Sequence, residues 1–224
     1  MNKVNYQKEL DKILDNPENI GKKLLLHSCC APCSSYVLTY LSEFFDITVF
    51  YYNPNIMDDS EYIHRVEEEK RLIRALNEEG IPKFPIKIIE GEHDVERFLE
   101  ISKGLEDAKE GGARCAKCFR LRLEKTMEIA IENEADYFAT TLTISPLKNP
   151  ELINGIGLEL EKEYYEKYAK DIDNPGKLKY LMSDFKKKDG YKISIELSKK
   201  YDLYRQNFCG CEFSKNETNN LEDN

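Results

Sequence analysis

The cysteines of this chain are grouped in a way that predicts chemistry. Its seven cysteines fall into three sets: Cys29, Cys30 and Cys33; Cys115 and Cys118; and Cys209 and Cys211. Thiolates are the usual ligands of iron–sulfur clusters and of structural zinc, and a pair of thiols can also exchange electrons as a dithiol and a disulfide. The sets lie far apart in the sequence, so a fold must bring them together. The pattern predicts a metal or redox centre.

Two of the sets together offer four ligands. Cys115 and Cys118 stand at the start of a predicted helix, where they can place two sulfurs on one metal and where the helix dipole lowers thiol pKa values. Cys29 and Cys30 are adjacent, and they can face one site if the backbone turns sharply, as it does between a strand and a helix. A zinc staple is the alternative, although four-thiolate zinc sites more often pair two CxxC units.

The third set has a different spacing. A disulfide between Cys209 and Cys211 would close a very small and strained ring, which is easily reduced and therefore suits redox cycling. Gly210 supplies the backbone freedom for such a turn. The alternative is that this pair binds the same metal as the other cysteines. Cys33 forms a CxxC with Cys30, as in thioredoxin-like motifs, but it equally fits a packed helix residue and receives no role.

Strands and helices alternate in the first part of the chain. Strands are predicted at 22–28, 46–52, 84–89 and 136–140, and helices at 34–45, 59–79, 93–102 and 118–133, with Ser34 as a cap. This order predicts an α/β fold with a mostly parallel sheet flanked by helices. A helical C-terminal part without a clear strand follows from Asn149. We expect one catalytic domain over residues 1–214 and a disordered tail over 215–224.

The same strand predictions place a site. Ligands of open parallel sheets bind at the carboxyl ends of the strands, and Cys29 and Cys30 directly follow the first predicted strand. His27 ends that strand and is expected to be a core or supporting residue rather than a ligand. His64, His93 and the run Glu67 to Glu69 lie on charged helical segments and are expected to face solvent.

Composition excludes some classes of protein. No apolar run approaches the roughly 20 residues of a membrane span, and the first residues predict an amphipathic helix rather than a signal peptide. We therefore expect a cytoplasmic protein, in which stable disulfides are rare. The net charge of −9 does not indicate nucleic-acid binding. From Lys177 to Arg205, however, nine Lys/Arg stand against four Asp/Glu, a local net charge of +5.

Five segments of the chain resemble the epoxyqueuosine reductase QueH family. They are LLLHSCCAPCSSY (24–36), FYYNPNI (50–56), GARCAKCFRLRLEKT (112–126), FATTLTISPLKN (138–149) and DFKKKDGYKISIELSKKYDLYRQNFCGC (184–211). The resemblance implies a two-electron reduction that removes the epoxide oxygen of epoxyqueuosine in the anticodon loop of tRNA, giving queuosine and water. It also implies an adenine-nucleotide α-hydrolase-like (HUP-type) sheet.

The resemblance further implies cofactors and partners. A [4Fe-4S] cluster is expected on Cys29, Cys30, Cys115 and Cys118, and Cys209 and Cys211 are expected to be redox-active. A second metal ion, iron or zinc, beside the cluster is also implied, without assignable ligands. The partners are tRNA and an unidentified electron donor. The cations and rings for an anticodon loop would come from residues near the last cysteine pair: Lys186, Lys187, Lys188, Tyr191, Lys192, Tyr204 and Arg205.

Two other functions stay open at this point. A cluster-dependent tRNA sulfur transferase would share the fold and the cluster, but it needs ATP, and the chain lacks the G-x-x-x-x-G-K-[ST] phosphate loop. A zinc-stapled RNA-binding adaptor would hold zinc alone and would have no colour. Turnover without ATP and iron bound to the purified protein distinguish the reductase from both.

Overall fold

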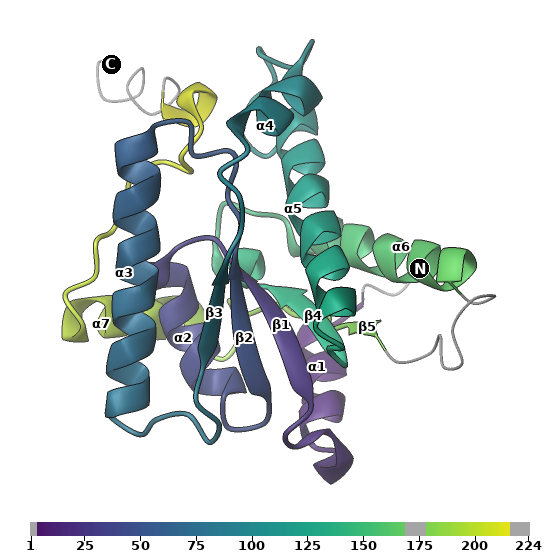
Figure 1. Ribbon diagram of the computed structural model, residues 1–224, viewed down its shortest axis with the longest axis vertical. Coiled ribbons are helices and arrows are strands. Elements are labelled where there is room, and N and C mark those ends of the chain that lie inside the picture. Colours follow the sequence, from purple (N-terminus) through teal and green to yellow (C-terminus); the bar gives the residue numbers. More distant parts are fainter. Residues whose placement is uncertain (1–3, 169–177, 216–224) are drawn as a thin grey trace.

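A five-stranded parallel sheet with the order β3-β2-β1-β4-β5 forms the centre of the molecule (Figure 1). The computed structural model describes residues 4–168 and 178–215. The strands are β1 (Lys23–Ser28), β2 (Asp46–Tyr51), β3 (Lys87–Glu90), β4 (Tyr137–Thr140) and β5 (Lys179–Tyr180). The central strand β1 pairs in parallel with β2 and with β4. Ser28 of β1 lies opposite Tyr51 of β2, and His27 lies opposite Thr140 of β4. The carboxyl ends of these three strands therefore meet at one edge of the sheet.

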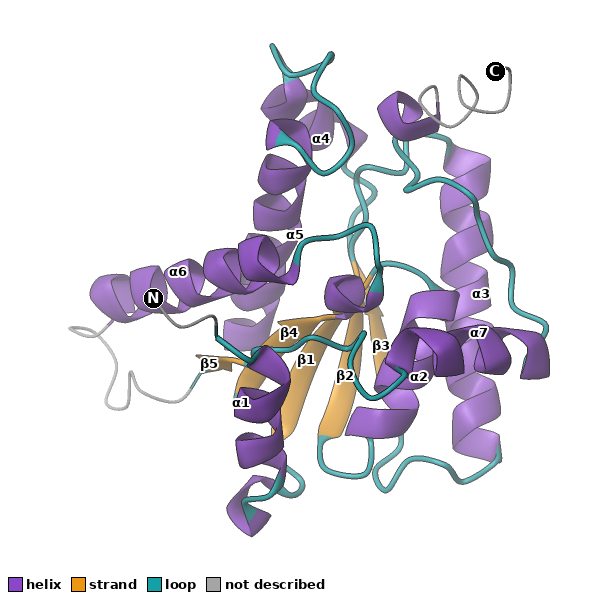
Figure 2. Cartoon of the chain, turned by 180° about the vertical axis from the view of Figure 1, so that it is seen from behind, coloured by secondary structure: helices purple, strands orange, loops and turns teal. Residues whose placement is uncertain are grey.

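Helices cover both faces of the sheet (Figures 1 and 2). The helices are α1 (Tyr6–Leu14), α2 (Ala31–Leu41), α3 (Asp59–Glu78), α4 (Val95–Ser102), α5 (Ala113–Glu132), α6 (Pro150–Tyr168) and α7 (Gly190–Lys200), with short 3-10 helices η1 (Pro17–Asn19) and η2 (Thr141–Ile144). In β1, Leu24 and Leu26 pack in a core with α1, α2 and α3, whereas Leu25 packs with α5 and α6. Since both faces of the strand are buried, its sequence is continuously apolar rather than alternating.

The predicted α/β class and the parallel sheet flanked by helices are confirmed. The C-terminal part does contain a strand, β5, which is too short at two residues to leave a pattern in the sequence. The single domain over residues 1–214 stays a prediction. The tail predicted at 215–224 lies outside the described residues, apart from Lys215. Within the described ranges, no helix combines the length and apolar character that crossing a membrane requires.

The start of α2 differs from its prediction in a way that changes the site. The helix begins at Ala31 with Cys30 as its N-cap residue, because Pro32 fits the first turn of a helix. The prediction of Ser34 as the cap was wrong, because Ser34 is a residue of the helix itself. Its hydroxyl lies 2.6 Å from the hydroxyl of Ser28. Cys33 is therefore part of the first turn of α2 and faces the end of β1.

Candidate functional site

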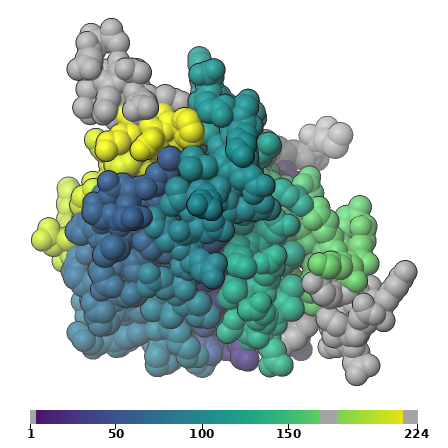
Figure 3. Space-filling view, turned by 45° about the horizontal axis from the view of Figure 1, so that its top comes forward, coloured from purple at the N-terminus to yellow at the C-terminus, as the bar shows by residue number. Residues whose placement is uncertain are grey.

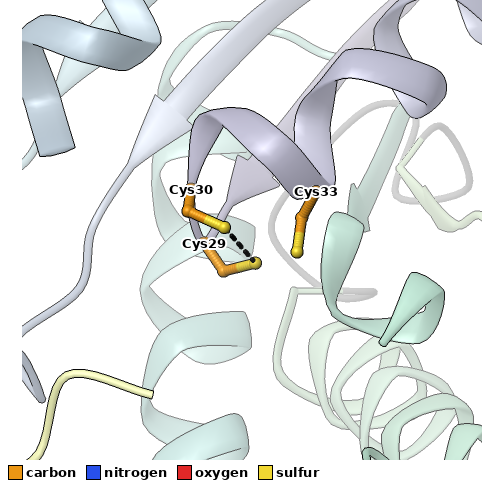
Figure 4. A group of neighbouring side chains, drawn as sticks. All are labelled: Cys29, Cys30 and Cys33. Carbon is orange, nitrogen blue, oxygen red and sulfur yellow. Dashed lines mark hydrogen bonds between the residues drawn. The ribbon is translucent and has the colours of Figure 1, made fainter. Parts of the chain in front are cut away.

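The junction of β1 and α2 brings three thiols together (Figure 4). The sulfurs of Cys29, Cys30 and Cys33 all lie within 4.8 Å of one another. Those of Cys29 and Cys30 are 3.9 Å apart, and the Thr141 hydroxyl donates a hydrogen bond to the Cys29 sulfur at 3.4 Å. The structure thus places Cys33, which has no role in the sequence prediction, beside two of the proposed ligands.

Within this group of three thiols, Cys29 is the one whose pKa is lowered. Hydrogen bonds from the thiols of Cys30 and Cys33 hold the pKa of Cys29 well below its usual range. The same contact with Cys29 raises the pKa of Cys30 to about 12 and raises that of Cys33 well above its usual range. The N-terminus of α2 adds a dipole that favours a thiolate. Three sulfurs this close together are suited to bind a soft metal ion.

The other four cysteines line a second, small pocket. Its walls include Cys115 and Cys118 on α5, and Cys209 and Cys211 near the end of the described chain. The backbone N–H of Gly111 donates to the Cys115 sulfur at 3.2 Å. Burial raises the pKa of Cys115 and of Cys211, and raises that of Cys118 to about 12. Two cysteine pairs that are distant in sequence therefore share one pocket.

The two groups of thiols are neighbours but do not merge. In the described part of the chain, neither Cys115 nor Cys118 belongs to the close group of three sulfurs around Cys29. Of the four ligands expected from the sequence, the structure thus pairs Cys29 with Cys30 and Cys115 with Cys118. The assignment of all four to one cluster stays a prediction, as does the redox role of the last pair.

Arg122 on α5 connects the two groups. Its side chain is buried, and its Nε donates to the Cys118 carbonyl at 3.4 Å and its Nη1 to the Asn53 Oδ1 at 3.2 Å. Asn53 in turn donates to the carbonyl of Ser28 at 2.8 Å. A chain of hydrogen bonds therefore runs from the helix that carries the CxxC pair to the end of β1, one residue before Cys29.

Two cations lie within electrostatic range of both groups of thiols. Burial lowers the pKa of Arg122, but the thiolates of Cys118, Cys209 and Cys29 outweigh it and the net shift is upward. Burial likewise lowers the pKa of Lys148, and the thiolates of Cys209 and Cys29 again raise it overall. Neither residue was predicted to belong to the site, because a single Arg in a helix or a single Lys in a loop has no sequence pattern that separates it from surface charges.

The segment that carries the last cysteine pair is held against α3. Figure 3 shows this segment, in yellow, packed between α3 and the region around α4. Arg65, with 2% of its side chain exposed, donates to the carbonyls of Cys209 at 3.4 Å and Phe208 at 3.5 Å. Its Nε also pairs with Glu61 at 2.7 Å. A buried guanidinium on α3 thus fixes the backbone at Cys209.

Gly210 fits the same segment against the loop after β2. The Met57 N–H donates to the Gly210 carbonyl at 3.3 Å, and the Asn55 amide donates to the Cys209 carbonyl at 3.2 Å. Gly210 has φ +112°, and a Cβ there would lie 2.7 Å from Ile56 Cγ1. Both the conformation and the close approach require glycine between the two cysteines.

His27 is a buried core residue next to the site, as expected from the sequence. It is fully buried at the end of β1, with Nδ1 2.8 Å from the Thr140 hydroxyl and Nε2 3.1 Å from the Tyr52 carbonyl. Because the carbonyl can only accept, Nε2 carries the proton and Nδ1 accepts from Thr140. Burial lowers the pKa of His27 to about 3. The ring is therefore neutral and ties β1 to both neighbouring strands.

Three residues expected to face solvent are largely covered: Glu68, Glu69 and His93. The Glu68 side chain is only 11% exposed. Glu69 is fully buried, and burial raises the pKa of its carboxyl to about 8. It lies two helical turns after Tyr62 and one turn before Ile73, on the face of α3 that packs inward. His93 stacks on Tyr62 with 3.8 Å between ring centres, and its Nε2 lies 2.6 Å from the Ile56 carbonyl. His64 is exposed, as predicted.

Comparison with known proteins identifies the family. A family model described as epoxyqueuosine reductase QueH matches residues 24–217. Epoxyqueuosine reductase QueH of Staphylococcus epidermidis is 41% identical over 216 residues, which cover 95% of this chain and 85% of that protein. This chain belongs to the epoxyqueuosine reductase QueH family. QueH of Thermotoga maritima is 34% identical over 194 residues, covering 85% of this chain and 89% of that protein.

Membership in the QueH family places the chain among the oxidoreductases, as predicted. The five segments that carry the resemblance all fall within residues 24–217, as does every cysteine. A solved structure, the U34-tRNA thiolase NcsA from Methanococcus maripaludis with its [4Fe-4S] cluster, aligns with a TM-score of 0.49 at 14% identity, covering 97% of this chain and 72% of that one. A likeness at this level supports no conclusion about the site.

Proposed function

We propose that this QueH-family chain reduces epoxyqueuosine in the anticodon loop of tRNA to queuosine, by means of a [4Fe-4S] cluster and a redox-active cysteine pair. The cluster ligands are Cys29, Cys30, Cys115 and Cys118, and the redox pair is Cys209 and Cys211. One observation carries the proposal: the buried Arg122 lines one pocket with Cys115, Cys118, Cys209 and Cys211, and hydrogen bonds through Asn53 connect it to the residue before Cys29. Family membership supplies the reaction.

The residues of the site fit a thiolate-bound cluster. All seven cysteines are free thiols. The two proposed ligand pairs stand at the N-termini of α2 and α5, whose dipoles favour anionic sulfur. The Nη2 of Arg122 is buried without a hydrogen-bond partner, so the pocket contains positive charge that thiolate ligands would balance. A cluster bound there would supply one-electron transfer.

The pair Cys209 and Cys211 can supply the electrons and protons that the reaction consumes. Removal of the epoxide oxygen as water consumes two electrons and two protons. When the thiols of Cys209 and Cys211 close to a disulfide, they release both, so one dithiol reduces one epoxide. The external electron donor must then reopen the disulfide with two electrons and two protons. Lys148 supplies positive charge within range of Cys29 and Cys209, which favours the negative charge that develops on the departing oxygen.

The tRNA partner would contact exposed cations rather than the whole lysine run. Lys186 is committed to the fold, because its Nζ donates to the carbonyl of Thr143 at 3.0 Å and pairs with Asp184 at 3.2 Å. Lys188 pairs with Asp11 at 2.6 Å. Lys187 is exposed, and we propose it as the residue of this run that contacts RNA phosphates.

The test is anaerobic purification and reconstitution, with iron and sulfide analysis, followed by mass spectrometry of epoxyqueuosine-containing tRNA after incubation without ATP. We expect the single Ser variants of the four proposed ligands to lose iron. Cys209→Ser and Cys211→Ser should keep iron and lose turnover. Cys33→Ser is the matched control and should keep both, because Cys33 is close to the site but is not a proposed ligand.

Each contrary result has a distinct meaning. If Cys33→Ser loses iron while Cys115→Ser keeps it, the ligand set is the group around Cys29 instead. Full turnover by both Cys209→Ser and Cys211→Ser would remove the redox role. A colourless protein that holds zinc alone would favour the RNA-binding adaptor, and an absolute requirement for ATP would favour a sulfur transferase.

A further inference from the structure

Arg122 is a buried charge without an acidic partner. Only 1% of the residue is exposed, its two hydrogen bonds go to neutral acceptors, and its Nη2 has none. Two other arginines, Arg65 on α3 and Arg120 on α5, do have acidic partners: Arg65 pairs with Glu61 at 2.7 Å, and Arg120 with Glu163 at 2.7 Å. Within residues 4–168 and 178–215, four cysteines line the same pocket as Arg122: Cys115, Cys118, Cys209 and Cys211. A buried, unpaired cation is costly, so its place in the fold needs a reason.

Thiols are the groups available as counter-charge in this pocket. Arg122 lines it together with Cys115, Cys118, Cys209 and Cys211. In the described part of the chain, the carboxyl of Glu110 lines the same pocket but forms no ion pair with Arg122. A thiol that keeps its proton does not balance a guanidinium. The balance is reached when the thiols are held as anions, which is what ligation to a metal does.

We infer that Arg122 stabilises the anionic, metal-bound form of these thiols and raises the reduction potential of the centre they hold. The inference rests on the proposed cluster. Adding an electron makes a thiolate-bound centre more negative, so a fixed positive charge in the same low-dielectric pocket favours the reduced state over the oxidised one. Arg122 acts through the electrostatics of the ligands, and it is a positioning and tuning residue rather than a catalytic one.

The experiment compares reduction potentials of reconstituted proteins by spectroelectrochemical titration, with the reduced state followed by electron paramagnetic resonance. The variants are Arg122→Gln, which removes the charge, and Arg122→Lys, which keeps it. Arg120→Gln is the matched control, because Arg120 lies on the same helix but points to solvent and pairs with Glu163. Iron and sulfide content and circular dichroism are measured for each protein.

We expect Arg122→Gln to be harder to reduce, with at least a tenfold lower ratio of reduced to oxidised cluster at a fixed potential, which is about 59 mV for one electron. Arg122→Lys should recover most of this shift, and Arg120→Gln should match the wild type. A folded Arg122→Gln that contains no iron, beside a loaded Arg122→Lys, would also support the role of the charge.

Two results would overturn the inference. One is a fully loaded Arg122→Gln whose potential equals that of the wild type. The other is loss of iron from both Arg122 variants while they stay folded, which would show that the pocket needs the shape of the guanidinium and not its charge. Failure of the wild type itself to bind iron would instead refute the proposed function, and this outcome is visible before any variant is compared.

Discussion

Removing the guanidinium of Arg65 should release the segment that carries the last cysteine pair. The informative change is Arg65→Met, which keeps most of the apolar stem but loses the charge. The two hydrogen bonds to the carbonyls of Phe208 and Cys209 are long, at 3.5 and 3.4 Å, and each should contribute about 1 kcal/mol. The Arg65 guanidinium also lies 5.1 Å from the centre of the Phe208 ring, a contact of about 0.5–1 kcal/mol.

The carboxylate of Glu61, which loses its ion-pair partner in this variant, adds to the loss of stability. Removing one partner of a fully buried ion pair costs roughly 3–5 kcal/mol. Glu61, however, keeps 18% of its side chain exposed and also accepts a hydrogen bond from the Tyr204 hydroxyl at 3.1 Å. We therefore expect its share to be about 1 kcal/mol, so that Arg65→Met loses about 3–4 kcal/mol in all.

The assay is amide hydrogen exchange, read at the Met57 N–H, which donates to the Gly210 carbonyl. If the segment opens as a local unit, a loss of about 3 kcal/mol makes this amide exchange roughly 100-fold faster. Arg65→Lys should give a smaller effect, because it keeps the charge beside Glu61 but not the fork that reaches two carbonyls. Arg74→Met is the control, since Arg74 lies exposed on the same helix. Unchanged exchange at Met57 in Arg65→Met would refute the argument.

Three further predictions concern single residues. Glu69→Gln should gain stability over the wild type as pH rises from 5 to 8, by up to about 1.4 kcal/mol per pH unit. In this range the unfolded acid is ionised while the buried acid, whose pKa burial raises to about 8, stays protonated, so the wild type alone loses stability as pH rises; urea unfolding at each pH measures this. Gly210→Ala should lose about 1–3 kcal/mol, also by urea unfolding, since its Cβ would meet Ile56 at 2.7 Å. Lys187→Ala should lower the salt dependence of tRNA affinity by about one phosphate contact, measured by binding titrations at several salt concentrations. Lys186→Met should leave that dependence unchanged and lower the stability, measured by urea unfolding.

Each of these three has a matched control. Glu67→Gln on the exposed face of α3 should show no comparable gain with pH, and an equal gain in both variants would contradict the buried-acid argument. Gly104 also has positive φ, but a Cβ added there would meet no atom within 4 Å, so Gly104→Ala isolates the backbone cost from the clash. Equal losses of stability in the two alanine variants would show that the contact with Ile56 does not contribute to the loss at Gly210. If Lys186→Met alone changes the salt dependence, the assignment of the two lysines is reversed.

Much of the fold could be predicted because the central strands β1 and β4 are buried on both faces. A run such as that around Leu25 is apolar without interruption, and turn residues bound it, so the strands and their parallel order follow from local pattern alone. The start of α2 could not be placed, since Pro32 and Ser34 are both suitable near a helix N-terminus. The burial of Glu69 was predictable in principle, because it shares a helix face with Tyr62 and Ile73.

The residue types of the candidate site were predictable from the sequence, but the buried charges around them were not. The spacing of the cysteines indicates metal or redox chemistry before any contact is known. The position of Arg122 depends on Asn53, which lies on a different element and receives its hydrogen bond across the sheet edge. The grouping of Cys33 with Cys29 depends likewise on where α2 begins. Contacts of this kind arise from tertiary packing, and no local pattern encodes them.

The position of the last cysteine pair near the end of the described chain has a consequence for biosynthesis. The wall of the pocket that holds Cys209 and Cys211 comes from the last described part of the chain, and it docks on α3 and on the loop after β2. Translation proceeds from the N-terminus, so the sheet and both proposed ligand pairs emerge from the ribosome before this wall exists. The thiols proposed as cluster ligands can therefore bind metal before Cys209 and Cys211, which could form disulfides with them, have been made.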